Sequence, residues 1–180
     1  ITPDSFSDGG KYLNEKKAIH KAKFLINSGS QIIDVGGEST RPGAKEVKPL
    51  LEWKRIKNVL KFIRNKYPKF KISLDTRKSF VMQNGLKMKI NIINDISGFE
   101  FDKNSIKVIK KFKPPIIINH SQGTPKTMQK NPKYNNALLD IYDYFEKRIE
   151  FLKKNNIKIN NVILDPGIGF GKNLKHNLMI

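Results

Sequence analysis

Three polar side chains that could bind a nitrogen heterocycle each follow a short apolar run of the chain. They are Asp75, Asn94 and Asp165. A carboxylate accepts hydrogen bonds from adjacent N–H donors, and an amide both donates and accepts. The three together could therefore recognise the edge of a ring that carries N–H groups beside a carbonyl. The alternative is that such residues only cap the turns after the runs, which is our interpretation of Asp34 and Asp95.

Two loops rich in glycine, hydroxyl groups and charge could complete a site. The first, residues 2–10 (TPDSFSDGG), contains Asp8 and Phe6, and a mobile loop of this kind could bring a carboxylate and an aromatic ring over a ligand. The second, residues 36–43 (GGESTRPG), carries hydroxyls and Arg41 and suits an anionic, phosphate-like group. Taken singly, these segments could instead be a disordered terminus and an ordinary strand-to-helix connection.

A third glycine-rich segment, residues 165–172 (DPGIGFGK), resembles two phosphate-binding loops and matches neither. A P-loop requires glycine where Pro166 stands, and serine or threonine where Asn173 stands. A dinucleotide-binding loop requires a third glycine where Lys172 stands. We therefore exclude an ATPase and an NAD-dependent enzyme.

The composition is that of a globular chain with a strong positive charge. Hydrophobic residues make up 38% of the 180 residues, and there is no cysteine for a disulfide or a thiolate metal site. No apolar run is long enough to span a bilayer, and no secretion signal stands at the start, so we expect a cytoplasmic protein without a membrane partner. The net charge of +19 could indicate nucleic-acid binding. The lysines are scattered and accompany no nucleic-acid motif, so we expect solvated helix faces and no nucleic-acid partner.

The elements that must position the polar residues follow from the hydrophobic pattern. Five β-branched runs, each with Asp, Asn or His at its end, predict buried parallel strands at residues 32–38, 72–77, 92–95, 116–120 and 162–167. Between them lie stripes with helical spacing, namely Ala18, Ala22, Leu25 and Ile26, then Ile56, Leu60 and Ile63, then Leu138, Ile141, Phe145, Ile149 and Leu152, with Gly29 as a helix stop. Such alternation fits a doubly wound sheet or a (β/α)8 barrel. Five polar strand ends in succession favour the barrel, although five strands cannot close it.

The ordered motifs resemble the dihydropteroate synthase family. They cover almost the whole chain: residues 2–10 (TPDSFSDGG), 32–43 (IIDVGGESTRPG), 73–78 (SLDTRK), 92–98 (IINDISG), 119–129 (NHSQGTPKTMQ) and 163–173 (ILDPGIGFGKN). The resemblance implies a transferase of folate biosynthesis that condenses 6-hydroxymethyl-7,8-dihydropterin pyrophosphate with p-aminobenzoate to give 7,8-dihydropteroate and pyrophosphate. It further implies a single α/β domain over residues 1–180, a (β/α)8 barrel that lacks its first strand and its last two strands. A cytoplasmic homodimer that sulfonamides target is expected for the complete protein.

The resemblance also implies which residues bind the pterin and act in the reaction. Asp75, Asn94 and Asp165 would bind the pterin, with Ile96 packed against its ring. Asp8 would stabilise the pterin cation that forms when pyrophosphate departs.

The remaining implied roles concern the second substrate, pyrophosphate and the metal. Thr40 and Arg41 would contact pyrophosphate or the incoming amine, and the p-aminobenzoate pocket would be formed by Phe6, Pro42, Gly169 and Phe170. Mg2+ would assist the leaving group through a family asparagine expected just before Ile1, so we expect no metal ligand within this chain. Asn119 and Ser121 stand where methionines are common in the family.

Three other functions stay open at this point. A methyltransferase acting on methyltetrahydrofolate shares the barrel and the pterin-binding Asp and Asn, but it does not need the two long loops. An RNA-binding protein is suggested by charge alone, and a salt titration of RNA affinity would test it. An inactive homologue of the family is the third, and the intact loops argue against it.

Overall fold

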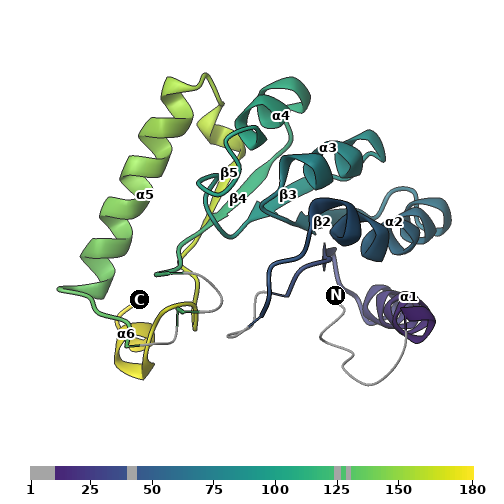
Figure 1. Ribbon diagram of the computed structural model, residues 1–180, viewed down its shortest axis with the longest axis horizontal. Coiled ribbons are helices and arrows are strands. Elements are labelled where there is room, and N and C mark those ends of the chain that lie inside the picture. The colour runs from purple at the N-terminus through teal and green to yellow at the C-terminus, as the bar shows by residue number, and fades with distance from the viewer. Residues whose placement is uncertain (1–10, 40–43, 124–126, 129–130) are drawn as a thin grey trace.

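Five strands alternate with helices along the chain (Figure 1). The computed structural model describes residues 11–39, 44–123, 127–128 and 131–180, with side chains from Glu15 onward. The strands are β1 Ile32–Gly36, β2 Lys71–Asp75, β3 Ile92–Asp95, β4 Ile116–Asn119 and β5 Val162–Asp165. The helices are α1 Lys11–Asn27, α2 Pro49–Lys66, α3 Ser79–Lys87, α4 Ser105–Phe112, α5 Ala137–Lys154 and α6 Leu174–Leu178, and the 3-10 turn η2 Ile159–Asn161 precedes β5.

The strands form one parallel sheet in the order β1-β2-β3-β4-β5. Each strand is therefore added on the same side of the previous one, whereas a doubly wound sheet reverses direction at a switch point. The five predicted strands and their parallel pairing are confirmed, but the expected burial is wrong for β5, an outer strand of the sheet, whose Ile163 and Leu164 are exposed. Their sequential order is that of consecutive βα units in a (β/α)8 barrel.

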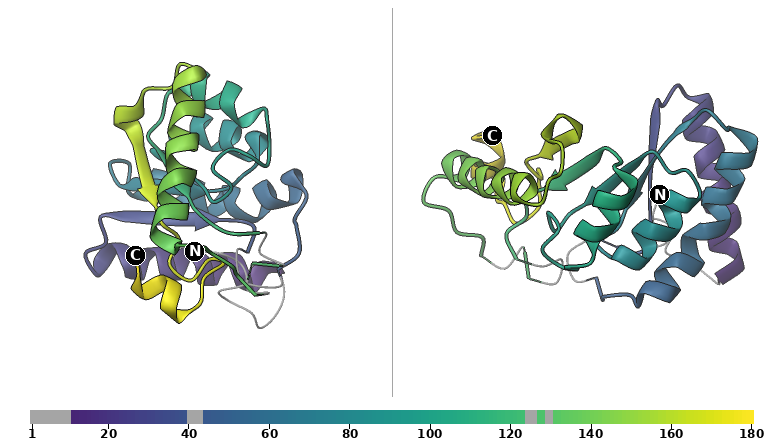
Figure 2. Two further views of the ribbon diagram at one scale, coloured as in Figure 1. Left: turned by 90° about the vertical axis from the view of Figure 1, so that its left-hand side faces the viewer. Right: turned by 90° about the horizontal axis from the view of Figure 1, so that it is seen from above.

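Helices pack against one face of this sheet. Neighbouring helices contact each other in the series α1, α2, α3 and α4, and Figure 2 shows α5 at the β5 end of the sheet, far from α1 at the other. On β1, Ile33 and Val35 are buried in the core while Ile32 and Asp34 are exposed. Because side chains alternate along a strand, Asp34 lies on the face away from the helices.

The predicted helical stripes are confirmed, with one exception. Gly29 has a φ of +89° after the end of α1 and its amide donates to the Ile26 carbonyl, as expected of a helix stop. Leu138 was expected in the buried stripe of α5 and is 50% exposed. It lies in the first turn of that helix, one turn before Ile141, which is the first residue of the stripe to reach the core.

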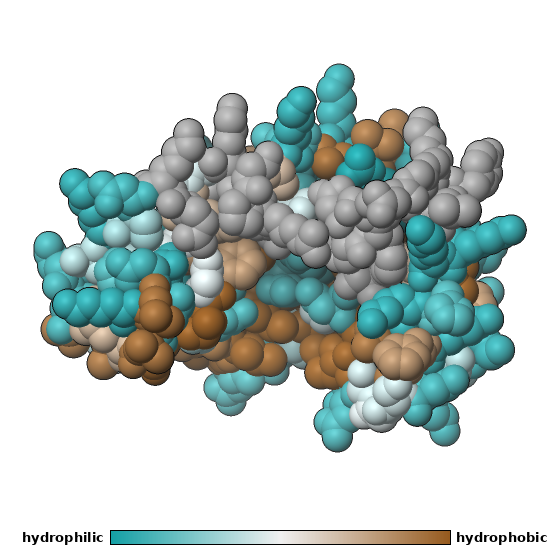
Figure 3. Space-filling model, turned by 90° about the horizontal axis from the view of Figure 1, so that it is seen from below, coloured by the Kyte–Doolittle hydropathy of each residue, from teal (hydrophilic) through white to brown (hydrophobic). Residues whose placement is uncertain are grey.

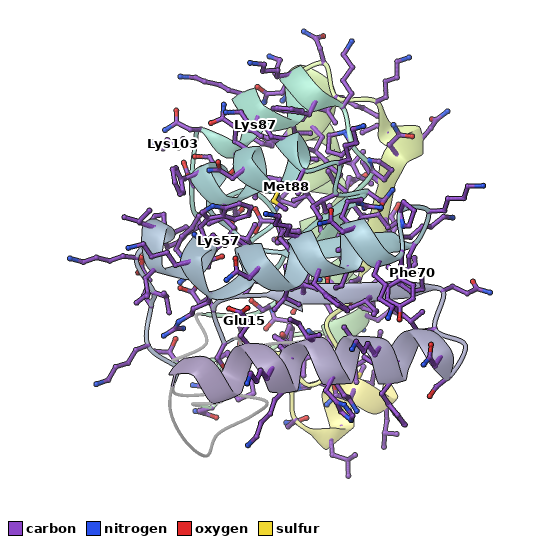
Figure 4. The ribbon with its side chains drawn as sticks, turned by 90° about the vertical axis from the view of Figure 1, so that its right-hand side faces the viewer. Glu15, Lys57, Phe70, Lys87, Met88 and Lys103 are labelled. Carbon is purple, nitrogen blue, oxygen red and sulfur yellow. The ribbon has the colours of Figure 1, made fainter. Side chains whose placement is uncertain are left out.

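The outer helical layer carries much of the positive charge. In Figure 4, the exposed side chains of Lys57, Lys87 and Lys103 come from α2, from α3 and from the loop before α4. Glu15, labelled between α1 and α2, accepts a hydrogen bond of 2.8 Å from Asn58. Separate elements supply these lysines, which fits the expectation of solvated helix faces.

Some large apolar side chains of the described residues are exposed. Figure 3 shows hydrophobic side chains gathered along one side of the face seen there. Exposed residues of this kind include Ile32 on β1 together with Ile163 and Leu164 on β5, the two outer strands of the sheet. None of the described helices combines the length and the apolar character that a bilayer crossing requires.

Candidate active site

The predicted pterin ligands lie at the carboxyl ends of neighbouring strands. Asp75 ends β2 and pairs in register with Asn94 of β3, while Asp165 ends β5 and pairs with Asn119 of β4. Ile93, which precedes Asn94 on β3, is completely buried on the helix side, so Asn94 lies on the other face. The structure therefore brings Asp75 and Asn94 side by side and places Asp165 two strands away at the same edge.

Two side-chain amide oxygens at this edge are buried hydrogen-bond acceptors without a donor among the described residues. The Oδ1 atoms of Asn94 and Asn119 have no hydrogen-bond partner among the described residues. Leaving a buried polar atom unpaired costs free energy, so such atoms often mark a place that a ligand or water completes. Asn94 uses its Nδ2 to donate to Asp34 Oδ2 at 3.3 Å. The interpretation of Asp34 as a turn cap was therefore wrong, because Asp34 lies inside β1 and faces the site edge.

Asp75 sits in a cluster of carboxylates that resists its ionisation. Burial raises the pKa of Asp75 well above its ordinary value, and the negative charges of Asp34, Glu52 and Asp95 raise it further. Gly36 of β1 lies against it, and a Cβ atom there would be 3.1 Å from Asp75 Oδ2. A ligand that brings N–H donors to this carboxylate would favour its charged form.

The loop after β5 holds Asp165 and the two residues assigned by resemblance to the p-aminobenzoate pocket. The Gly167 amide donates to Asp165 Oδ1 at 2.8 Å, and the Phe170 amide donates to the Gly167 carbonyl at 2.9 Å. Gly169 is exposed and donates from its amide to Asn177 Oδ1 in α6. Gly169 and Phe170 thus follow Asp165 within one compact turn.

Ile96 lies just beyond Asn94 in the chain and lines a pocket of about 230 Å³. The other described residues around this pocket are Arg77, Ser97, Glu100, Phe101, Ser121, Gly123 and Tyr144. Of the residues that line the pocket, Ile96 and Ser121 are the two that the sequence analysis discusses individually. Most of these residues lie in the segments that follow β2, β3 and β4, so the pocket lies near the carboxyl ends of those strands.

The residues assigned to the first two loops lie outside the described residues. These are Phe6, Asp8, Thr40, Arg41 and Pro42. The base of the second loop is nevertheless defined, because Glu38 Oε2 accepts a hydrogen bond of 2.7 Å from the Val47 amide. The Glu38 carboxylate therefore connects the chain that precedes residues 40–43 to the chain that follows them.

Sequence reasoning missed the ionic network that holds this loop base. The Lys78 ammonium, 2% exposed, donates to Glu38 Oε2 at 2.6 Å and to Glu52 Oε2 at 2.7 Å. Thr76 donates to the other oxygen of Glu52 at 2.5 Å, and Arg77 Nε donates to Glu38 Oε1 at 2.8 Å. Burial alone would raise the pKa of Glu38, but the hydrogen bonds from Lys78 and Val47 and the nearby positive charges bring it below its ordinary value.

This network connects the second loop to the strand end that carries Asp75. Lys78 and Thr76 follow Asp75 closely in the chain, Glu52 lies in the first turn of α2, and Glu38 belongs to the second loop. The only signal in the sequence was the presence of charged residues next to a buried strand. Nothing in their spacing indicated which ones would meet.

The residues described here do not form a site that fits a metal ion. No group of three or more His, Asp or Glu side chains among them could hold one. The resemblance implies no metal ligand among these residues, so Mg2+ stays a prediction, and we assign no described residue to it.

Asp95 was interpreted as a turn cap, and the structure confirms it. Its Oδ1 accepts from the Ser97 amide at 2.8 Å and from the Ser97 hydroxyl at 2.6 Å, and the carboxylate is completely buried. Burial raises the pKa of Asp95 to about 6, although the hydrogen bonds from Ser97 and Phe99 oppose the rise. The protonated form is thus favoured by folding.

We therefore expect Asp95 to make stability fall as pH rises. A folded-state pKa above the ordinary value means that its stabilising contribution is present in acid and is lost as pH rises toward about 6. We compare the free energy of unfolding of Asp95→Asn with that of the wild type at each pH. The value for the variant minus the value for the wild type should increase by roughly 2 kcal/mol from about pH 4 to about pH 7. Urea denaturation at several pH values measures this difference. A difference that does not change with pH would show that Asp95 ionises as freely in the folded as in the unfolded chain.

Comparison with known proteins shows the family to which this fold belongs. The family model described as pterin binding enzyme matches residues 1–180. The chain belongs to the pterin-binding enzyme family. Dihydropteroate synthase from Haemophilus influenzae is 38% identical over 180 residues, which are 100% of this chain and 65% of that protein. The similarity therefore extends over every element described above.

Two solved structures show the same fold. The Yersinia pestis dihydropteroate synthase in a sulfonamide drug complex superposes with a TM-score of 0.90 at 38% identity, over 99% of this chain and 64% of that one. The Clostridium difficile dihydropteroate synthase, solved in the presence of pteroic acid, gives 0.87 at 37% identity, over 99% of this chain and 65% of that one. The chain thus spans slightly less than two thirds of the length of these members of the pterin-binding family. Its five βα units form part of an α/β barrel.

Proposed function

We infer that this chain is the pterin-binding part of a dihydropteroate synthase, a single barrel domain that joins a pterin to p-aminobenzoate. The observation that supports this most is the position of Asp75, Asn94 and Asp165 at one edge of the sheet, with buried acceptor atoms beside them. The relatives support the choice of reaction, because pteroic acid, present with one of them, is itself a pterin joined to p-aminobenzoate.

The described residues suggest how the pterin would be oriented. Asp75 and Asp165 accept hydrogen bonds from the N–H groups of the ring, and Asn94 offers an amide oxygen that has no other partner among the described residues. Because these groups lie on the ends of strands within one sheet, little rearrangement would be needed when the ring binds. Ile96 would add an apolar contact from the turn after β3.

The reaction exchanges one bond at the exocyclic carbon of the pterin. The bond from that carbon to the pyrophosphate oxygen breaks, and the electron pair leaves with pyrophosphate. The amine nitrogen of p-aminobenzoate then bonds to the carbon and loses a proton. By resemblance, Asp8 would stabilise the intermediate cation, while Thr40 and Arg41 would contact pyrophosphate or the amine, and electrostatic stabilisation of this kind is often the largest catalytic contribution.

The resemblance supplies the remaining proposals. Phe6, Pro42, Gly169 and Phe170 would surround p-aminobenzoate, and the Yersinia relative bound to a sulfonamide suggests that such drugs compete for that pocket. Mg2+ would assist departure of pyrophosphate when bound. A homodimer and a cytoplasmic location also stay predictions.

The test is a condensation assay on the protein as its gene encodes it. Labelled p-aminobenzoate, the pterin pyrophosphate and Mg2+ are supplied, and formation of dihydropteroate is followed beside an Asp165→Ala variant. We expect turnover that falls by about 100-fold or more in the variant, because two charge-assisted hydrogen bonds are lost. A folded wild-type protein that binds pterin but forms no product would instead indicate the methyltransferase or an inactive homologue.

A further inference from the structure

Lys172 is a buried cation outside the set of residues assigned above. Its side chain follows the glycine-rich turn after β5, and the residue is 3% exposed. The ammonium group lies 2.9 Å from the Gly167 carbonyl oxygen, 2.9 Å from that of Phe170 and 3.2 Å from that of His120. It also lies 3.0 Å from His120 Nδ1. A single side chain therefore contacts the loops that follow β4 and β5.

The three carbonyl oxygens and His120 Nδ1 converge on one point, where a charged donor is needed. An ammonium has three N–H donors and accepts nothing, so His120 Nδ1 must be the acceptor in that contact. The neutral imidazole is favoured, because burial and the charge of Lys172 lower the pKa of His120 to about 4. Without the cation, the His120 and Phe170 carbonyl oxygens and the His120 ring nitrogen would lose the donor that Lys172 supplies, and the Gly167 carbonyl would keep only its bond from the Phe170 amide.

The two loops approach each other too closely for side chains to separate them. Gly167 has a φ of +69°, and a Cβ atom at this residue would be 2.1 Å from the His120 carbonyl oxygen. Only glycine fits such an approach. The backbone of the β5 loop therefore rests directly on the chain after β4, and Lys172 binds both sides of that contact.

The same turn orients a proposed pterin ligand. The Gly167 amide donates to Asp165 Oδ1, and the Gly167 carbonyl accepts from Lys172. Further along the turn, Phe170 is held in the same manner through its carbonyl. Movement of the ammonium would release the turn on which both Asp165 and Phe170 depend.

We propose that Lys172 is a positioning residue, which fixes Asp165 and the turn of residues 167–170 in the geometry that the substrates require. It touches neither substrate and acts through the Gly167 and Phe170 carbonyls. This inference rests on the proposed function only where the ligand is a pterin, because the contacts that hold the turn exist without one.

The charge of Lys172 makes this role sensitive to alkaline pH. Burial lowers the pKa of Lys172 to about 8, although the negative charge of Asp165 opposes the fall. The other titratable groups around Lys172 are His120, Tyr134 and Asp140 of α5. The Tyr134 hydroxyl donates to the Gly171 carbonyl at 2.8 Å, and its ring contacts His176 of α6. The negative charge of Asp140 favours a higher pKa for both His120 and Tyr134. Burial raises the pKa of Tyr134 to about 12, so Tyr134 stays neutral while Lys172 loses its proton.

The experiment compares Lys172→Met with Lys175→Met, which removes an exposed lysine three residues later, in the protein as its gene encodes it. Exchange of the backbone amide hydrogens of residues 167–171 is measured first, at neutral pH without ligand. Affinity for 6-hydroxymethylpterin is then measured by calorimetry near pH 7 and near pH 9. Lys172→Gln, which keeps an amide donor, serves as a second variant if Lys172→Met does not fold.

We expect faster exchange in this turn and about tenfold weaker pterin binding in Lys172→Met near pH 7, with Lys175→Met unchanged. The difference in pterin affinity between the wild type and Lys172→Met should be smaller near pH 9, where Lys172 of the wild type is itself neutral. Ionisation of the pterin affects both proteins equally and therefore cancels in this comparison. Unchanged exchange overturns the inference, as does faster exchange with unaltered pterin affinity. If the wild type binds no pterin, the proposed function fails, and the exchange measurement alone still decides whether Lys172 holds the turn.

Discussion

Asp75→Ala is expected to weaken pterin binding by about 100-fold or more, because it removes a carboxylate that, in the proposed function, would accept two charge-assisted hydrogen bonds from the ring edge. The strand itself should survive, since Asp75 is the last residue of β2 and lies on the face opposite the buried Ile72 and Leu74. Calorimetric titration with a pterin measures the affinity, and the condensation assay measures the matching loss of turnover.

Ser73→Ala is the matched control for this variant. Ser73 lies two residues earlier on the same strand and the same face, and its buried hydroxyl has no partner among the described residues. Removing that hydroxyl should leave pterin affinity within about twofold of the wild type, which is a small change in binding free energy beside the expected effect of Asp75→Ala. Equal losses in the two variants would contradict a specific role for Asp75 and would point to damage to β2.

The raised pKa of Asp75 adds a pH signature to the same prediction. The carboxyl group must be ionised for both of its oxygens to accept from the ring N–H groups, whereas burial together with Asp34, Glu52 and Asp95 favours its protonated form. Pterin affinity should therefore increase as pH rises through the pKa of Asp75. Asp34→Asn removes one of these charges and should move the midpoint of that increase to lower pH.

Lys78→Met is expected to have the largest effect on stability. It removes the cation that Glu38 and Glu52 share while both carboxylates stay buried, and breaking a buried ion pair in this way costs roughly 3–5 kcal/mol. The free energy of unfolding in urea measures the loss. Lys103→Met, at an exposed lysine, should change it by less than about 0.5 kcal/mol.

A double variant separates the ion pair from simple packing. If an unpaired carboxylate causes the loss in Lys78→Met, then adding Glu52→Gln should recover part of the stability, because the substituted side chain would bury an amide in place of a charge. A loss that is unchanged in the double variant would assign the effect to the lysine stem. Stability of Lys78→Met within about 0.5 kcal/mol of the wild type would contradict the prediction altogether.

The order of strands and helices could be read from the sequence because it depends on local patterns. Short β-branched runs such as Ile116–Ile118 favour buried strands, and the stripe Ile56, Leu60 and Ile63 has the period of a helix. Polar residues at the end of each run then meet at one edge, because parallel strands place their carboxyl ends together. Asp75 and Asn94 needed no further information to be placed at the same edge.

The tertiary structure alone decided which charged groups meet across the loops. Glu38 contacts Lys78, 40 residues later in the chain, and Lys172 contacts His120 across 52 residues. Neither pair has a spacing that a local pattern could reveal. The contact between Asp34 and Asn94 likewise joins residues far apart in the chain. Hydrophobic periodicity acts over one or two turns of chain, whereas the pairing of buried charges depends on how whole elements pack against one another. The sequence therefore determined where the proposed pterin ligands lie, and only the packed fold determined what holds them in place.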